Sequence, residues 1–459
     1  MALRDDHLRG AVRNVTGLMS AGRTRALAEL SDPDAVRDVA RAVRQRCVAQ
    51  LPELLDRWAT ALEARGGEVH WADDAGEAVA AVRAIVARRG ATLVVKGKSM
   101  ASEEIHLNVA LQADGVEVVE SDLGEYIMQV AGEPPAHIIV PSIDKDRYDV
   151  AELFTRDAGR PIPPQVDAEA AYVRTRMRDV FLRAGVGISG VNFAVAETGS
   201  ICLVTNEGNG RMVSSVPPVH IAIMGMERIV ESWAELDVML SLLARSATGQ
   251  RLSVYTNIIT GTRQAGEVDG PEELHVIVLD NGRSGILGSE FREALDCIRC
   301  GACLNVCPVY RNVGGHSYGS VYPGPIGAVL SPLLHPEDPQ ARELANASSL
   351  CAACVDACPV RIPLVDLLLA VRRRDAADLG RAKRTAFGAW ALLWASRPGF
   401  ALSGAVARRM LPLARRLRGG PGWAGAWLRS RTAPAPEPVP PGRFAVRPVR
   451  PDGPGGDTR

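Results

Sequence analysis

The chain has 459 residues, of which 47% are hydrophobic and 23% are charged, and its formal net charge is zero. This length suits two or three domains with sizeable cores. The balanced charge gives no reason to expect a nucleic acid partner. The N-terminus lacks the apolar run of a secretory signal, and no stretch reaches the roughly 18 apolar residues that span a bilayer. We therefore expect a cytoplasmic protein, in which clustered cysteines bind metal more often than they form disulfides.

The first part of the chain alternates between expected helices and expected strands. Helices are predicted at about 34–64, 74–90, 102–115, 167–185 and 226–247. Strands are predicted at 68–72, 91–97, 116–121, 137–142, 220–225, 252–259 and 274–280, with two more around a turn in 191–210. Such alternation predicts a mainly parallel sheet with helices on both faces. We therefore expect one α/β domain over residues 1–285.

Two rare lysines lie in the segment VVKGKSMASEE, which follows a strand and leads into a helix. Ligands of open α/β sheets bind where strands end, and the amides at a helix start attract anions. Lys96, Lys98 and Ser99 are therefore candidates for binding an anionic ligand, with Glu103 nearby. The alternative is a solvated turn in which Ser99 or Ser102 caps the helix.

A second polar segment of this domain, AETGSICLVTNEGNGR at 196–211, places acidic and amide side chains around turns. Its candidates for ligand binding are Glu197, Thr198, Asn206, Glu207 and Asn209. The alternative is that these residues only form turns, for which Asn and Gly are favoured. The glycines here and at 185–190 lack the strand and helix context of a dinucleotide-binding motif, so we assign no flavin or nicotinamide site.

Four cysteines stand close together in CIRCGACLNVCP at 297–308, with the spacing Cys-x2-Cys-x2-Cys-x3-Cys-Pro. Zinc sites usually use pairs of ligands separated by a dozen or more residues. Thiols this dense suit an iron–sulfur cubane, and in two-cluster ferredoxins the fourth cysteine of such a run ligates the other cluster. The spacing favours iron–sulfur clusters over zinc or purely structural thiols.

The segment CAACVDACP at 351–359 repeats the last three cysteine positions of the first run, and Ser348 stands where a first cysteine would be. Crossed ligation assigns one cluster to Cys297, Cys300, Cys303 and Cys358. It assigns the other to Cys307, Cys351 and Cys354, and leaves one iron without a cysteine. The alternatives for this iron are a serine oxygen, an outside ligand or a three-iron cluster, and for Ser348 the role of a helix cap is favoured over ligation. Cys47 and Cys202 have apolar neighbours and are expected to be inert buried thiols.

The remaining chain reads as helical and then as irregular. Residues 286–375 predict an all-α ferredoxin-like domain, and 376–430 predict a C-terminal helical segment. This segment carries an apolar stripe beside arginines, so we expect it to pack on this chain or dock on a partner, or to contact an anionic membrane surface. Residues 431–459 are rich in Pro and Arg, which predicts a disordered tail.

These motifs together resemble the lactate utilisation protein B family, the iron–sulfur proteins of the bacterial L-lactate utilisation system. The resemblance covers about residues 50–375 and includes both cysteine runs, KGKSMASEEIHLN, ESDLGEYIMQ, HIIVPSIDK and GVNFAVAETGSICLVTNEGNGR. It implies a domain similar to the sugar-isomerase and CoA-transferase α/β class, followed by a ferredoxin-like module with two 4Fe-4S clusters. The family also lacks the eighth cysteine, so Ser348 is no departure from it.

The implied role is an electron carrier in the oxidation of L-lactate to pyruvate, working beside other subunits of the system and an electron acceptor. On this interpretation the chain is an electron-transfer subunit and not the catalyst. One alternative is an iron–sulfur subunit for another 2-hydroxy acid, such as glycolate. Another is an enzyme that acts through its CoA-transferase-like domain, where Glu197 or Glu207 is a candidate nucleophile by analogy and the clusters are structural.

Overall fold

The computed structural model of the chain describes residues 2–376 and 381–417. The chain divides into two compact units, Met1–Ala377 and Asp378–Arg459. Among the described residues, no helix combines the length and the apolar character needed to cross a bilayer. The tail predicted at 431–459 lies outside the described residues.

Three long helices precede the first strand: α1 (Asp6–Leu27), α2 (Pro33–Ala49) and α3 (Leu51–Glu63), after the 3-10 turn η1 (Ala2–Arg4). The Asp32 carboxylate accepts a hydrogen bond from the amide of Ala35 and so caps α2, in which Pro33 occupies the first turn. The single helix predicted at 34–64 is therefore two helices, which meet at Gln50.

The main sheet has six parallel strands in the order β1-β10-β7-β4-β2-β3. Its strands are β1 (Gly67–Ala72), β2 (Leu93–Lys96), β3 (Glu117–Glu120), β4 (Val186–Gly190), β7 (Val219–Gly225) and β10 (Glu273–Leu279). The central strand β7 is buried at every position, as expected for a parallel strand covered on both faces. The parallel α/β architecture predicted from the alternating pattern is confirmed.

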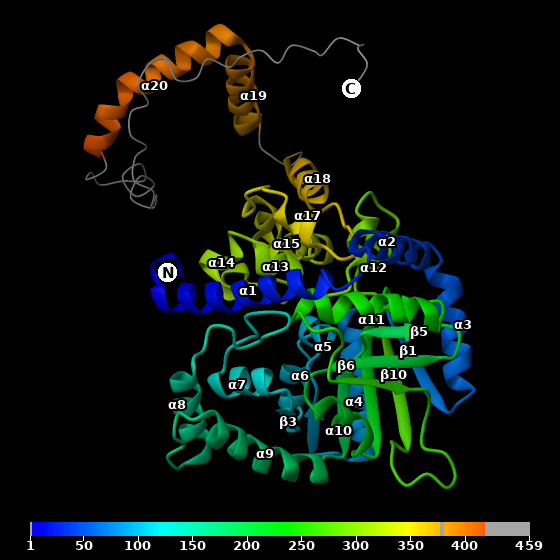
Figure 1. Cartoon of the computed structure of the whole chain (residues 1–459). Coiled ribbons are helices and arrows are strands. Elements are labelled where there is room, and N and C mark those ends of the chain that lie inside the picture. The colour runs from blue at the N-terminus through cyan, green and yellow to red at the C-terminus, as the bar shows by residue number, and fades with distance from the viewer. Residues whose placement is uncertain (1, 377–380, 418–459) are drawn as a thin grey trace, which may run out of the picture. The chain divides into compact units, whose positions relative to one another are not determined.

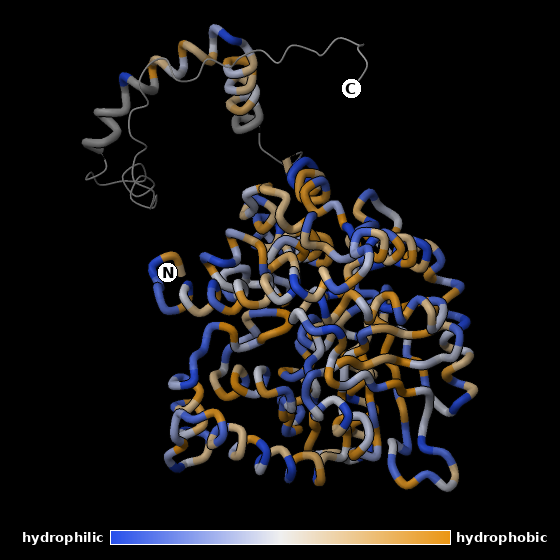
Figure 2. Tube along the Cα trace, viewed as in Figure 1, coloured by the Kyte–Doolittle hydropathy of each residue, from blue (hydrophilic) through white to orange (hydrophobic). Residues whose placement is uncertain are grey.

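Helices cover both faces of this sheet (Figure 1). One face packs on α4 (Ala75–Arg89), α5 (Met100–Glu104) and α6 (Leu107–Ala113), and the other on α7 (Leu123–Ala131), α8 (Arg147–Ala158), α9 (Val166–Arg183) and α10 (Asn209–Ser215). Val94 belongs to the first of these cores and Val95 to the second, as the two-residue period of a strand requires. In Figure 2 the strands of this sheet are coloured mainly as hydrophobic along the trace.

A second sheet, with the order β8-β5-β6-β9, packs beside the first. It comprises β5 (Phe193–Val195), β6 (Ser200–Thr205), β8 (Ile229–Val230) and β9 (Tyr255–Ile259). Helix α11 (Trp233–Ala247) shares an apolar core with this sheet. The predicted hairpin at 191–210 is present as β5 and β6. The helix predicted to begin at residue 226 is wrong at its start, because β8 comes first and Ser232 caps α11.

The strand predicted at 137–142 is also wrong. The segment forms bends and turns, in which the amide of Ala136 donates to the carbonyl of Pro141 at 2.8 Å and closes a loop. A proline lacks the amide hydrogen that a sheet ladder needs, so an apolar run that includes Pro141 pairs poorly as a strand. The side chains of this loop instead face the cysteine-bearing region, as described below.

The secondary structure of the cysteine-bearing region consists of helices joined by turns and loops, as predicted. Its elements are α12 (Arg283–Leu287), η2 (Arg292–Asp296), α13 (Ala302–Val306), α14 (Tyr310–Val313), η3 (His316–Tyr318), α15 (Gly324–Leu334), α16 (Pro339–Glu343), η4 (Leu344–Asn346), α17 (Ala353–Ala357) and α18 (Leu364–Ala376). The N-terminal helix α1 contacts this region, since the Ser20 hydroxyl donates to the Asn305 carbonyl at 3.2 Å. One continuous apolar core joins α2, α3 and the second sheet to these helices, and the boundary at residue 285 stays a prediction.

The second unit contains two described helices, α19 (Arg381–Ala395) and α20 (Arg397–Leu417). Large apolar side chains are exposed along them, among them Phe387, Trp390, Leu392 and Phe400. Trp390 stacks on Trp394 with ring centroids 5.2 Å apart. Docking on a partner or contact with a membrane surface stays a prediction for this segment.

Candidate metal centre and adjoining cavity

The two cysteine runs adopt the same local backbone. In each run the residue before a short helix has a positive φ, Gly301 at 72° before α13 and Ala352 at 64° before α17. Each helix ends at a cysteine with extended backbone, Cys307 or Cys358. A left-handed residue followed by one helical turn directs successive side chains and amides toward a common centre. The repeated spacing in the sequence therefore encodes a repeated fold.

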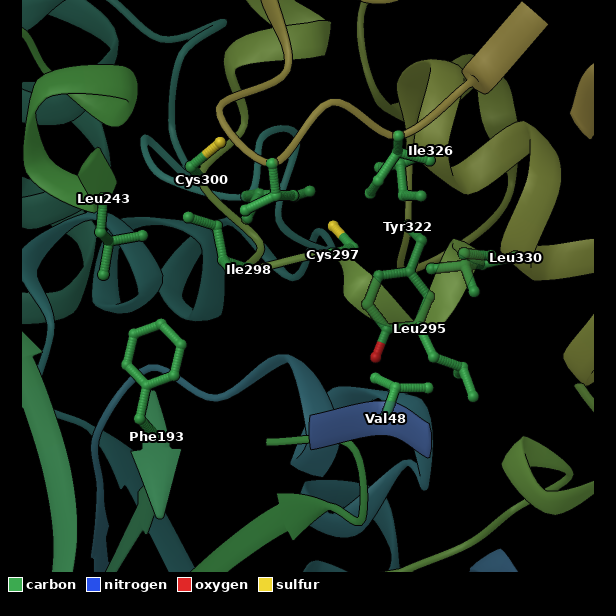
Figure 3. Close-up of a cluster of buried hydrophobic side chains, with 14 of the residues drawn as sticks. Val48, Phe193, Leu243, Leu295, Cys297, Ile298, Cys300, Tyr322, Ile326 and Leu330 are labelled. Atoms are coloured by element: carbon green, nitrogen blue, oxygen red, sulfur yellow. The ribbon is translucent and has the colours of Figure 1, made fainter. Parts of the chain in front are cut away.

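The structure brings Cys358 to the first three cysteines of the first run. Together they line one small cavity with apolar neighbours such as Ile138, Ile326 and Ile362, and the four cysteines are Cys297, Cys300, Cys303 and Cys358. Figure 3 shows Cys297 and Cys300 among these buried side chains, with Tyr322 and Ile326 beside them. We call these four residues the first thiol group.

The chemistry of the first thiol group fits a metal cluster. Burial raises the pKa of Cys300 to about 12 and that of Cys358 to about 11, so these thiols remain protonated unless a metal holds the thiolate. The amide of Arg299 donates to the sulfur of Cys297 at 3.4 Å, and that of Ile362 donates to the sulfur of Cys358 at 3.3 Å. Amide donors aimed at sulfur are the means by which proteins stabilise iron–sulfur thiolates.

The remaining three cysteines, Cys307, Cys351 and Cys354, interact electrostatically with one another and form the second thiol group. Cys351 is exposed, so this group reaches the protein surface, whereas every cysteine of the first group is buried. A hydrogen bond from the Ser349 hydroxyl lowers the pKa of the Cys351 thiol. Ser348 instead accepts a hydrogen bond from the Leu350 amide at 3.2 Å, as a turn cap does.

A cavity of about 470 Å³ opens at the carboxyl ends of β2, β3, β4 and β7, which is where open α/β sheets bind ligands. Ile138 and Arg299 line both this cavity and the space between the thiols of the first group, so a single layer of side chains separates the two. We call the cavity at the carboxyl ends of the strands the sheet-edge cavity. Arg299 stands between two cysteines of the first run, so the cavity and the thiols share one loop.

The candidate residues of the α/β domain are only partly brought together. Lys98, Ser99 and Asn206 line the sheet-edge cavity. Lys96 is completely buried and pairs with Glu103 at 2.7 Å and Glu120 at 2.8 Å. Burial opposes its charge, but the two carboxylates raise the pKa of Lys96 above its ordinary value.

Two further candidates, Glu197 and Ser99, accept hydrogen bonds from backbone amides at helix starts. The Glu197 carboxylate accepts a hydrogen bond from the Trp233 amide at 3.1 Å, at the start of α11, and it is not among the residues that line the cavity. The Ser99 hydroxyl accepts from the Ser102 amide at 3.2 Å and caps α5 while it also faces the cavity.

The two buried thiols outside the runs have raised pKa values because of burial, about 11 for Cys47 and about 12 for Cys202.

A buried ion-pair network that the sequence did not reveal forms one wall of the cavity. Arg283 makes a bidentate contact with Glu104 at 2.8 and 2.7 Å and a further contact with Glu227 at 2.8 Å. The network reaches the cysteine loop because Arg299 contacts Glu227 at 3.3 Å and lies 4.4 Å from the centre of the Tyr322 ring. Although burial opposes its charge, these arginines lower the pKa of Glu227 to about 2.

A carboxyl group with a raised pKa lies elsewhere on the cavity wall. Burial, and then repulsion from Asp122, raises the pKa of Glu207 to about 7. Its carboxylate accepts hydrogen bonds from the Leu123 amide at 3.2 Å and the Asn209 side chain at 2.9 Å. A carboxyl group that titrates near neutrality is suited to exchange a proton with a ligand.

Comparison with known proteins matches both parts of the chain to family models. Residues 55–279 match the LUD domain, and residues 293–362 match a 4Fe-4S dicluster domain. Lactate utilization protein B of Bacillus licheniformis is 46% identical over 95% of this chain and 92% of its own length. Lactate utilization protein B of Exiguobacterium sp. is 50% identical over 81% of this chain and 79% of its own length.

A relative from Escherichia coli strain K12 bears the name uncharacterized electron transport protein YkgF, and it is 48% identical over 81% of this chain and 78% of its own length. Among solved structures, a DUF162 family protein from Deinococcus radiodurans covers 50% of this chain and 98% of its own, with a TM-score of 0.29 and 18% identity. That structural similarity is too low to inform function, whereas the sequence similarity extends through both domains.

Proposed function

Because the chain belongs to the lactate utilization protein B family, we propose that it carries electrons in the oxidation of L-lactate to pyruvate. The observation on which this rests is the pair of thiol groups, one buried and one at the surface. Electrons pass between redox centres one at a time, and two adjacent centres provide a path from a buried donor side to an exposed acceptor side. On this proposal the chain is a subunit that works with other proteins of the system and an electron acceptor.

The first thiol group would hold a complete 4Fe-4S cluster, since it supplies four buried cysteines and amide donors. The second group would hold another cluster with three cysteines, Cys307, Cys351 and Cys354. The Ser349 hydroxyl hydrogen-bonds to Cys351, and the Tyr318 hydroxyl hydrogen-bonds to Cys307. Ser348 instead accepts a hydrogen bond from the Leu350 amide, so between the two serines we assign Ser349 in place of Ser348 as the candidate fourth ligand. If Ser349 does not bind iron, the fourth iron is exchangeable and a three-iron cluster forms readily.

Partner contact is proposed at the exposed side. Cys351 is exposed while the first group is covered, so electrons would leave through the second cluster. The helices α19 and α20 expose apolar side chains of the kind that dock on partners, among them Trp390 and Phe400.

We propose the domain boundaries 1–285, 286–375 and 376–430 because the sequence changes from alternating strands and helices to helices alone.

A redox titration of the anaerobically purified protein tests the carrier role. Two signals should be reversibly reduced in sequence, monitored by electron paramagnetic resonance. Clusters that cannot be reduced at any physiological potential would refute an electron-transfer role. A deletion strain should in addition fail to grow on L-lactate and regain growth when the gene is restored, and normal growth of the deletion strain would contradict the assignment to lactate.

One observation favours a second candidate function. Glu207, with its pKa of about 7, faces a cavity in a domain that resembles the CoA-transferase class, which suggests acid–base or acyl chemistry there. Glu207→Gln separates the two proposals, because it should leave reversible cluster reduction and growth on L-lactate intact if the chain only carries electrons. Growth of the deletion strain on glycolate tests the remaining alternative, a different 2-hydroxy acid.

A further inference from the structure

Arg228 follows β7 and lines the sheet-edge cavity at the end that adjoins the cysteine loop. Its side chain is only 11% exposed, and within residues 2–376 and 381–417 its guanidinium makes no hydrogen bond to another protein group. The nearest carboxylate oxygen, on Glu227, is 3.9 Å away. A largely buried guanidinium ordinarily forms close, directed hydrogen bonds with carboxylates or carbonyls, whereas Arg228 is left facing the cavity.

The neighbouring charges do not complete the pairing of Arg228. Glu104 is held by Arg283 in a bidentate contact, and Glu227 is shared between Arg283 at 2.8 Å and Arg299 at 3.3 Å. Two arginines thus meet two carboxylates, and the charge of Arg228 is in excess of these carboxylates; the other negative group that acts on it is the sulfur of Cys297 in the first thiol group. Isolated buried charge is costly, so its retention beside a cavity indicates a counter-ion that enters the cavity.

The chemistry of the wall defines the ligand. The planar fork of an arginine suits the two oxygens of a carboxylate. Apolar side chains, including Ile138, Val191, Met224 and Leu243, line the same cavity and would cover a hydrocarbon body. The volume of about 470 Å³ lies in the range of pockets that bind small organic molecules.

We propose that the sheet-edge cavity binds an organic acid, whose carboxylate pairs with Arg228 and whose apolar body lies against Ile138 and Met224. The carboxylate replaces the missing hydrogen-bond partner of Arg228. Arg299 and Ile138 separate this ligand from the first thiol group, so the bound negative charge lies next to the first cluster. Added negative charge opposes reduction, so the ligand binds less tightly once that cluster is reduced.

The test uses the cluster-loaded full chain under anaerobic conditions, with benzoate, acetate and inorganic phosphate as probes in isothermal titration. Benzoate should bind more tightly than acetate, because its ring gains the apolar contacts, and phosphate should bind least. Arg228→Gln should weaken benzoate binding by about 10- to 100-fold, the range for losing a hydrogen bond to a charged group. Arg228→Lys retains the charge but loses the fork, so it should lie between the wild type and Arg228→Gln.

Arg211→Gln is the matched control, since Arg211 lies outside this cavity and should leave benzoate affinity unchanged. Cluster absorbance in each variant reports correct folding. Phosphate binding in place of carboxylate binding would overturn the assigned ligand class, and benzoate affinity that is equal in Arg228→Gln and the wild type would overturn the role of Arg228.

A second measurement separates ligand binding from simple charge compensation of the cluster. Saturating benzoate should lower the midpoint potential of the first cluster in the wild type and not in Arg228→Gln. A tenfold difference in affinity between the oxidised and reduced forms corresponds to about 59 mV for one electron. If Arg228→Gln shifts the potential while no probe binds the wild type, Arg228 only balances the cluster charge and the proposal fails, whereas the electron-carrier role would stand.

Discussion

Removal of the Arg283 guanidinium should cause a large and pH-dependent loss of stability. Arg283 is 2% exposed and contacts Glu104 and Glu227, which are also buried. Arg283→Met replaces it with an apolar side chain of similar length. Glu104 then retains hydrogen bonds from Tyr322 at 2.5 Å and Asn281 at 2.7 Å but has lost its cation, while Glu227 retains Arg299.

The expected size follows from leaving a buried carboxylate without a cation. Breaking a buried ion pair by removing one partner costs about 3–5 kcal/mol. In a chain of this length the m-value exceeds the roughly 1–3 kcal/mol/M of small proteins, so the denaturation midpoint should fall by up to about 1 M urea.

The loss should grow as the pH rises. In the native protein Arg283 holds the pKa of Glu104 below its ordinary value against the effect of burial, so the contribution of Glu104 is complete above the unfolded pKa near 4.5 and is lost as pH falls through the lower folded pKa. In Arg283→Met, burial is unopposed and raises the pKa of Glu104. The variant therefore loses stability as pH rises above about 4.5, and its deficit should be larger at pH 8 than at pH 6.

Urea unfolding of the cluster-loaded protein under anaerobic conditions measures the loss of stability in Arg283→Met at each pH. Denaturation midpoints are compared under identical conditions, because a metal-loaded chain does not unfold in two states. Arg183→Met is the matched control: Arg183 pairs with Asp179 at 2.7 Å, but the two side chains are 54% and 58% exposed. That surface pair should be worth less than about 0.5 kcal/mol. Equal midpoints for the two variants, or a deficit that does not change with pH, would refute the reasoning.

Three further predictions concern the thiol groups and the lysines. Cys358→Ala should abolish the paramagnetic signal of the first cluster and spare the second, whereas Cys307→Ala should do the reverse; loss of the opposite signal in either variant would contradict crossed ligation. Air oxidation should produce a three-iron signal in the wild type, and Ser349→Cys should suppress it by supplying a thiolate, so an undiminished signal in that variant would exclude Ser349 from the cluster. Lys96→Met should cost about 3–5 kcal/mol in the same urea assay, because buried Glu120 loses its cation. Lys98→Met should cost less than about 1 kcal/mol, since Lys98 donates to a neutral partner, the Ile139 carbonyl, and equal losses would contradict this distinction.

Local patterns in the sequence were sufficient for the architecture of the main sheet and for the cysteine runs. Strands such as β7 and β10 are mainly apolar segments, as expected for parallel strands that are covered on both faces. The cysteines are separated by two or three residues, a distance at which the backbone alone determines how side chains converge. The loop at 137–142 shows the limit of such reasoning, since an apolar composition is compatible with a strand and with a covered loop alike.

Tertiary structure alone decided which charged groups are buried and what they meet. Lys96 and Lys98 are two residues apart on one strand end, yet one is enclosed by carboxylates and the other faces a cavity. Arg228, Arg283 and Arg299 come from separate segments that converge only after the second sheet and the cysteine loop pack against β7. The energy of a charge depends on its burial and on its partners across space, and neither quantity is written in the residues adjacent to it in the chain.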